Sequence, residues 1–322
     1  MAHEISVTED GVEEAAYAND PAWHGLGTVV RGATDSKTMI TAAHLDWRVD
    51  LVPLKTECGL AVPDKFATVR NEPRAILGVV GDRYRPVQNS EAFEFLDNLT
   101  MDGVMRYESA GALYGGRVVW VLARMPSVDV AADGDKMLRF VLFKTSHDGR
   151  SKVTAIPTSV RVVCANTLAV AMSGHSGEGF VHSGDVKKKL EQARRYVSQF
   201  DRAFDLFRDK AQVLATRRYT TSQAVDYLEK LFPTPDEDGA ALNARQRRVA
   251  AIRGALVNRS NTLESVCGTW WSLLNAVTET VDHDDKVRKT REQREHKFLS
   301  VVEGVGADLK QRALDVAVQM SA

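Results

Sequence analysis

Hydrophobic positions follow a strand-like pattern in the first part of the chain. Between about residues 21 and 184, short runs of β-branched and aromatic residues are separated by turn signals such as "NEP", "AADGD" and "SHDG". The runs cover residues 65–70, 75–80, 117–124, 138–145 and 159–164. Short runs separated by tight turns predict a mostly antiparallel sheet. Two helices are expected between the strands, one at 38–45 and one that begins at Asn89-Ser90, where polar caps precede an acidic first turn.

The pattern changes after Gly184. From 185 to 216 apolar residues recur every three or four positions, which predicts one long amphipathic helix. Further helices are expected at 241–258, 267–281, 286–302 and 306–320. The fold class is therefore expected to be α+β, with a sheet region followed by a helical region.

Three regions follow from these patterns. Residues 1–20 carry six acids and no Lys or Arg, and we interpret them as an acidic, flexible lead-in. Residues 21–184 form the β-rich domain, and residues 185–322 form a helical region that packs on it or extends from it.

Composition indicates a folded protein outside the membrane. Hydrophobic residues make up 44% and charged residues 26%, and the formal net charge is -1. The apolar run "VVWVLA" at 118–123 is far shorter than the roughly 18 residues that span a bilayer. The N-terminus has neither the basic nor the apolar segment of a signal peptide, and the three cysteines are widely spaced. We expect a cytoplasmic protein without a disulfide framework.

Charge is unevenly distributed. Residues 187–218 contain ten basic residues and four acids. Such an excess suits an anionic partner, although a solvated helix face gives the same pattern.

The stretch "SHDGRSKVTAIPTSVRVVCANTL" (146–168) allows an enzyme site to be considered. Cys164 could be a nucleophile with His147 as its base. However, His147 and Asp148 are adjacent in a turn and point apart, and Cys164 ends an apolar run, where cysteine usually packs as a small hydrophobe. Neither zinc-type spacing nor a phosphate-binding glycine loop is present. We therefore predict no catalytic residue, no metal site and no cofactor.

The interpretation that we favour for this stretch is electrostatic. Arginine and lysine interleaved with aromatic residues suit single-stranded nucleic acid, whose bases stack on aromatics while its backbone follows basic side chains. We predict Arg150, Lys152 and Arg161 as phosphate contacts. A second group comprises Arg83, Tyr84, Arg85, Lys187, Lys188 and Lys189.

Other residues of this stretch and the tryptophans are assigned structural roles. His147, Asp148 and Gly149 are expected to shape a tight hairpin turn. The strand after it is expected to break at Pro157, and "ANTLAVAM" (165–172) to form a packed helix. Cys164 is expected in the core, Trp23 to hold the N-terminal segment on the core, and Trp271 to lie on a buried helix face.

Several motifs, in order, resemble a known family: "AWHGLG", "GVVGDRYRPVQN", "YESAGALYGGRVVWVLA", "SHDG", "RVVCANTL", "GTWWSLLNAVTETVDH" and "GVGADLKQRALDVAV". From about residue 21 to the C-terminus the chain resembles the phage/plasmid-like protein family, which is classed only as a domain of unknown function. The pair "GTWW" departs from that family's usual Gly-Thr, small residue, Trp. The resemblance implies a setting in a phage, a plasmid or a prophage, and it supplies no catalytic residue.

A second resemblance concerns the order of elements. Strands at 65–164 followed by the long basic helix at 185–216 resemble the plan of single-strand annealing recombinases, which form rings or filaments. This implies an oligomer that binds single-stranded DNA in recombination or replication without ATP. Two alternatives stay open: a cysteine- or metal-dependent hydrolase or nuclease, and a non-catalytic protein that binds a host partner.

Overall fold

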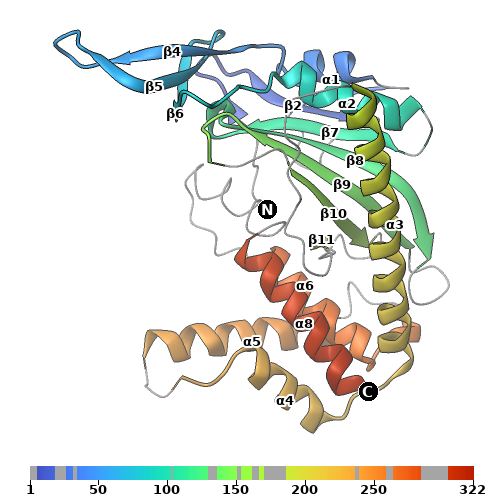
Figure 1. The fold of residues 1–322 in the computed structure, drawn as a ribbon. Coiled ribbons are helices and arrows are strands. Elements are labelled where there is room, and N and C mark those ends of the chain that lie inside the picture. Colours follow the sequence, from blue (N-terminus) through green and yellow to red (C-terminus); the bar gives the residue numbers. More distant parts are fainter. Residues whose placement is uncertain are drawn as a thin grey trace.

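The computed structural model describes residues 6–18, 27–31, 35–101, 103, 105–129, 136–150, 154–161, 167–169, 186–235, 239–258, 264–283 and 304–322. Strands occupy the first half of the chain and helices dominate the second, so the α+β class predicted from the hydrophobic pattern is confirmed (Figure 1).

The main sheet is antiparallel apart from one short pair. Its order is β1-β2-β7-β8-β9-β10-β11, and β3 adds to β2 in parallel. The strands are β1 (Ser6–Val7), β2 (Glu13–Ala18), β3 (Thr28–Val30), β7 (Arg106–Leu113), β8 (Val118–Asp129), β9 (Lys136–Ser146), β10 (Thr154–Arg161) and β11 (Thr167–Ala169). The central strands β7 to β10 are consecutive in sequence along the described sheet, as expected for a meander.

The acidic N-terminal segment differs from the sequence interpretation. Residues 6–18 contribute β1 and β2, so this part of the predicted flexible lead-in belongs to the sheet. Ala15 and Ala16 are fully buried beside β7, and Glu14 is 1% exposed because Arg70 pairs with its carboxylate. A run of acids suggested solvation, but one of them has a cationic partner in the interior.

A second, three-stranded sheet consists of β4 (Val49–Lys55), β5 (Ala61–Arg70) and β6 (Ala75–Gly81), in the order β4-β5-β6. Figure 1 shows β4 and β5 as a long hairpin that extends away from the main sheet. The β6 end of this sheet packs closely on the turn after β9. A Cβ on Gly78 would lie 2.6 Å from the Cα of Asp148.

Two local predictions around β10 are wrong. The strand continues through Pro157, which pairs with Val141 of β9. Among the described residues, β11 pairs with residues 158–160, beside Pro157. Residues 167–169 form β11 rather than part of a helix, because pairing with β10 overrides local helix propensity.

Most of the helices were predicted more closely, although α4 was not predicted. They are α1 (Ser36–Ala42), α2 (Asn89–Met101), α3 (Val186–Thr216), α4 (Thr221–Leu231), α5 (Ala240–Asn258), α6 (Trp270–His283) and α8 (Val305–Ser321). Helix α3 agrees with the predicted helix at 185–216 to within one residue. The helix expected at 286–302 lies outside the described residues.

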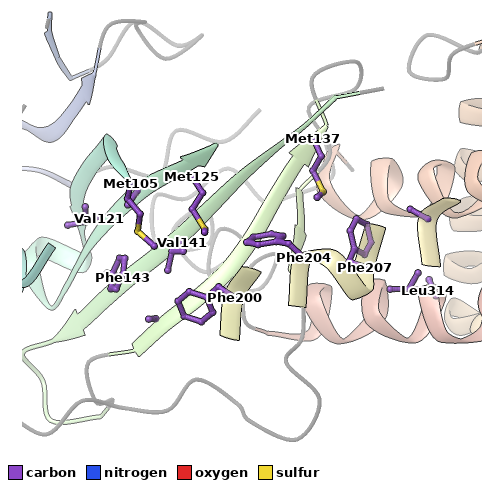
Figure 2. Close-up of a cluster of buried hydrophobic side chains, with 14 of the residues drawn as sticks. Met105, Val121, Met125, Met137, Val141, Phe143, Phe200, Phe204, Phe207 and Leu314 are labelled. Carbon is purple, nitrogen blue, oxygen red and sulfur yellow. The ribbon is translucent and has the colours of Figure 1, made fainter. Parts of the chain in front are cut away.

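Helix α3 joins the two halves through a shared core. Its aromatic face, with Phe200 and Phe204, is buried in one cluster with Met125 and Val141 of the sheet (Figure 2). Farther along α3, Phe207 contacts Trp271 of α6 with ring centroids 5.9 Å apart, and Trp271 is 1% exposed. The apolar stripe seen in the sequence is thus used to cover the sheet and to hold the helical half against it. Among the described helices, none has an apolar stretch that could cross a bilayer.

Candidate nucleic-acid interface

Strand β6 packs against the turn after β9 and limits which residues the turn can hold. Gly149 has a φ of +75°, which favours glycine, and a Cβ there would lie 2.8 Å from Cγ1 of Val80. The Asp148 carboxylate accepts hydrogen bonds from the Ser146 hydroxyl and, at 2.9 Å, from the backbone N–H of Arg150. The "HDG" sequence therefore forms a tight turn whose backbone position is set by its own carboxylate and by the neighbouring sheet.

The loop after β6 brings a second basic segment to this turn. The Tyr84 hydroxyl donates a hydrogen bond of 3.1 Å to the backbone carbonyl of Ser146. Burial, with a smaller effect of the Asp148 carboxylate, raises the pKa of Tyr84 to about 12, so the phenol stays protonated at neutral pH. Arg83 and Arg85 flank this tyrosine and are exposed. Segments about 60 residues apart in sequence are thereby held together.

Arg150 lies at the exposed side of the turn. Its side chain is 86% exposed, and its guanidinium is 3.8 Å from the Asp148 carboxylate. Arg85 folds back on its own loop, since its guanidinium donates to the carbonyls of Asp82 and Tyr84 at 2.8 and 3.0 Å. Both arginines remain accessible to an anion.

Arg117 also belongs to this surface, although we did not predict it as a contact. It is exposed, and its backbone carbonyl accepts a 2.8 Å hydrogen bond from the N–H of His147. The pairing of Val118 with Ser146 places Arg117 beside the turn. In the sequence, Arg117 is recognisable only as an arginine directly after the "YGG" turn. Its position beside the turn after β9 depends on the register of β8 on β9, which the sequence alone does not give. We call Arg83, Tyr84, Arg85, Arg117 and Arg150 the arginine surface.

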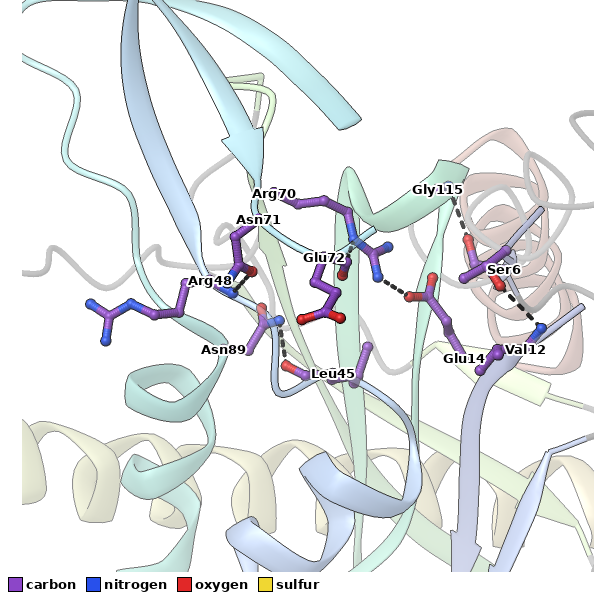
Figure 3. A network of polar contacts seen from close by, with 11 residues as sticks. Ser6, Val12, Glu14, Leu45, Arg48, Arg70, Asn71, Glu72, Asn89 and Gly115 are labelled. Carbon is purple, nitrogen blue, oxygen red and sulfur yellow. Dashed lines mark hydrogen bonds and ion pairs between the residues drawn. The ribbon is translucent and has the colours of Figure 1, made fainter. Parts of the chain in front are cut away.

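A buried polar cluster lies behind the arginine surface. We define it as Glu14, Trp47, Arg70, Asn89 and His147. The Arg70 guanidinium donates to Glu14 at 2.7 Å (Figure 3). It also lies 4.4 Å from the centre of the Trp47 ring. The Trp47 and His147 rings meet edge to face with centroids 5.4 Å apart. The cluster therefore links β2, β5 and the turn after β9 through the interior.

Asn89 fixes the protonation of His147. The Asn89 side-chain N–H donates to the carbonyl of Leu45 at 2.8 Å, so its oxygen faces Nε2 of His147 at 2.9 Å (Figure 3 shows the Asn89–Leu45 bond). Nε2 must then carry the proton, and Nδ1 is a bare acceptor. Burial lowers the pKa of His147 to about 4. The Asp148 carboxylate opposes this shift, and the Arg70 guanidinium adds to it.

Three polar atoms of the cluster have no hydrogen-bond partner among the described residues. They are Oε2 of Glu14, Nε1 of Trp47 and Nδ1 of His147. Asp148 makes its hydrogen bonds within the turn, whereas His147 bonds to Asn89, so the two do not form a His-Asp pair of the kind that activates a nucleophile. The cluster therefore positions the turn after β9, and His147 contributes through its buried contacts with Asn89 and Trp47.

Of the other predicted contacts, Arg161 has a described backbone position, and it does not join this surface. Arg161 lies at the opposite end of β10 from the turn, because it pairs with Met137 while Thr154 pairs with Lys144. Lys187, Lys188 and Lys189 lie in the first turn of α3, and their side chains are not described. Lys152, Cys164 and Trp23 lie outside the described residues.

Much of the basic character of α3 is neutralised locally. Arg208 pairs with Asp205 at 3.1 Å and Asp209 at 3.6 Å, and Lys210 pairs with Asp315 of α8 at 3.7 Å. Arg217, directly after the helix, donates to the last carbonyls of the chain. In the second half of this basic run, a solvated and internally paired helix face describes the charges better than an anion site does.

The described residues contain no cluster of three or more histidine, cysteine, aspartate or glutamate side chains suited to a metal ion. The side chain of Asp282 is 5% exposed, and its carboxylate accepts a hydrogen bond of 2.8 Å from Nζ of Lys310. Burial lowers the pKa of Lys310, and the Asp282 carboxylate opposes that shift.

Comparison with known proteins gave one match. Neither the curated proteins nor the solved structures contain a match to this chain. A family model described as "Domain of unknown function (DUF932)" matches residues 76–302, which include β6 from its second residue, the arginine surface and α3 to α6. Because the match covers more than half of the chain, the protein belongs to the DUF932 family.

Proposed function

We propose that the protein binds single-stranded nucleic acid at the arginine surface. The observation that carries the proposal is the convergence of four exposed arginines and a half-buried tyrosine from three separate segments, held by the Tyr84–Ser146 hydrogen bond. Arginine side chains follow a phosphate backbone, and the tyrosine ring offers a stacking surface for a base. Asp82 and Asp148 are the acids of the same loop and turn, and Asp148 is engaged with Ser146 and Arg150.

The setting that we propose is a mobile genetic element. The ordered motifs described above resemble the phage/plasmid-like protein family, and a sheet crossed by one long helix resembles the plan of single-strand annealing recombinases. On this basis the protein acts in recombination or replication as a homo-oligomer that needs no ATP. Light scattering on the purified protein tests the oligomer, and a monomer at all concentrations would contradict it.

Binding is tested by fluorescence anisotropy with a labelled single-stranded oligonucleotide. Affinity should fall as salt is raised, because arginine–phosphate contacts release counterions. The triple substitution R83A/R85A/R150A removes about three such contacts and should reduce the slope of log affinity against log salt by about 2.

Arg106 provides a matched control. It is exposed and pairs with Arg124 at the first residue of β7, whereas the turn lies beside the start of β8, at Val118. R106A should leave affinity and salt slope unchanged. Equal losses in R106A and in the triple variant would show that binding is not localised at the arginine surface, and no binding at about 50 mM salt and micromolar protein would refute the proposal.

A further inference from the structure

Helix α5 carries a second basic surface, far in the fold from the arginine surface. Figure 1 places α5 at the edge of the helical half, away from the sheet. Of its described side chains only Ile252 is buried, while Arg245 and Val249 on the same side are partly exposed. One side of a 19-residue helix therefore packs, and the other side faces solvent along its whole length.

The side of α5 that faces solvent combines small residues with long polar ones. At 100° per residue it carries small residues between long polar ones, all exposed or partly exposed: Ala240, Asn243, Ala244, Gln246, Arg247, Ala250, Ala251, Arg253, Gly254 and Val257. A Cβ on Gly254 would meet nothing within 4 Å, which shows how open this side is. Small residues allow a binding partner to approach the helix backbone, and the long side chains can reach it from both sides.

All charged side chains of α5 are positive. The helix contains four arginines and no acid. Arg245 is engaged by Glu229 of α4, and Arg248 lies over the ring of Phe232 at 5.3 Å. Arg247 and Arg253 are exposed and have no ion-pair partner in the part of the chain that the structure describes. The nearest preceding acids in sequence are at 236–238, before the helix and outside the described residues.

We propose that α5 binds double-stranded DNA by lying in the major groove. An α-helix with its side chains is about 10–12 Å wide, and the major groove of B-form DNA is about 12 Å wide, so this helix fits. Its unpaired arginines complement the phosphates, which is the charge match that favours a nucleic acid over a protein surface. Asparagine, glutamine and arginine are also the side chains that bond to base edges in that groove.

Duplex DNA is favoured over duplex RNA by shape. The major groove of A-form RNA is deep and narrow and does not admit a helix. This inference is independent of the proposed single-strand site, because α5 and the arginine surface are formed by different residues. A protein with both surfaces could hold a duplex and a single strand together, as at a junction between them.

The test compares three labelled probes with the full-length protein: a DNA duplex of about 20 base pairs, a single DNA strand of the same length, and an RNA duplex of the same length. The variant R247A/R253A removes two phosphate contacts. Its affinity for the duplex should fall about tenfold or more, and its salt slope on the duplex should decrease by about 1.8. Its single-strand binding should match that of the unaltered protein.

Two further variants provide matched controls. R247K/R253K keeps both charges and should retain the salt slope, and R202A removes an exposed arginine of α3 and should leave duplex affinity unchanged. Circular dichroism and the unfolding midpoint establish that each variant is folded.

The outcomes separate this inference from the proposed function. Loss of duplex binding alone in R247A/R253A supports the inference, even if the single strand never binds. It is overturned if the unaltered protein does not bind the duplex at about 50 mM salt, if R247A/R253A binds the duplex like the unaltered protein, or if RNA duplex binds as tightly as DNA.

Discussion

Protonation of the buried His147 should destabilise the protein as the pH falls. In the folded protein the ring is neutral, with Nε2–H donated to Asn89 and a pKa lowered to about 4 from 6.5 by burial. The unfolded chain therefore binds a proton between these two values while the folded protein does not. The stability that His147 contributes is complete above about pH 6.5 and is lost as the pH falls toward 4.

The size of the effect follows from the two pKa values. Between about pH 7.5 and 5 the linkage relation gives a loss of about 2 kcal/mol in the free energy of unfolding, and the loss reaches about 3 kcal/mol once both states are protonated. Carboxylates also titrate in this range, so the informative quantity is the difference in pH dependence between the unaltered protein and a variant. H147Q retains a donor toward Asn89 and does not titrate.

Urea unfolding at the two pH values measures this. H147Q should be less stable at neutral pH, but its stability should decrease by about 2 kcal/mol less on acidification. The control is H44N, which removes an exposed histidine at a φ of +54°, where asparagine is tolerated. The reasoning is refuted if H147Q and the unaltered protein show the same pH dependence. If H147Q does not fold, an NMR titration of His147 that gives a pKa near 6.5 refutes it equally.

Three more predictions concern packing and buried charge, each measured by urea or thermal unfolding. E14Q leaves Arg70 without its anionic partner in the interior and should cost about 3–5 kcal/mol, whereas E9Q at an exposed position should cost almost nothing. G78A places a methyl group 2.6 Å from the Cα of Asp148 and should destabilise by about 1–3 kcal/mol, whereas G254A on the open side of α5 should stabilise by about 0.5–1 kcal/mol. K310M removes the ammonium partner of the Asp282 carboxylate, whose side chain is 5% exposed, and should cost about 3–5 kcal/mol; a loss below about 1 kcal/mol would show that the pair is not shielded from solvent.

Elements with a strong local pattern could be predicted from the sequence. The stripe that includes Phe200, Phe204 and Phe207 repeats over many turns, so the bounds of α3 were predicted almost to the residue. The turn at Asp148-Gly149 was also recognised, because these residue types favour it wherever they occur between strands. In both cases residues close in sequence carry enough information.

The features that the sequence analysis missed depend on contacts between residues distant in sequence. Glu14 looks like one acid of a solvated segment until Arg70, 56 residues later, is placed beside it. Pro157 suggests a strand break from its own chemistry, but β10 continues through it because the neighbouring residues pair with β9. Arg117 gains its position only from the register of β8 on β9. A single sequence contains no local signal for any of these pairings.

The residues that hold the turn after β9 in place differ from the arginine that it exposes, so substitutions can change the stability of the turn and its surface charge separately. The backbone of Arg150 is fixed by the Asp148 carboxylate, by the packing of Gly149 on Val80 and by the burial of His147 beneath it. Its own side chain contributes little to this support, since it is 86% exposed. Substituting Arg150 should therefore change surface charge at constant stability, whereas substituting His147 or Gly78 should change stability and turn position at constant surface charge. If single-strand affinity falls in both groups of variants, binding requires a rigidly held turn, and if it falls only with the arginines, charge alone is sufficient.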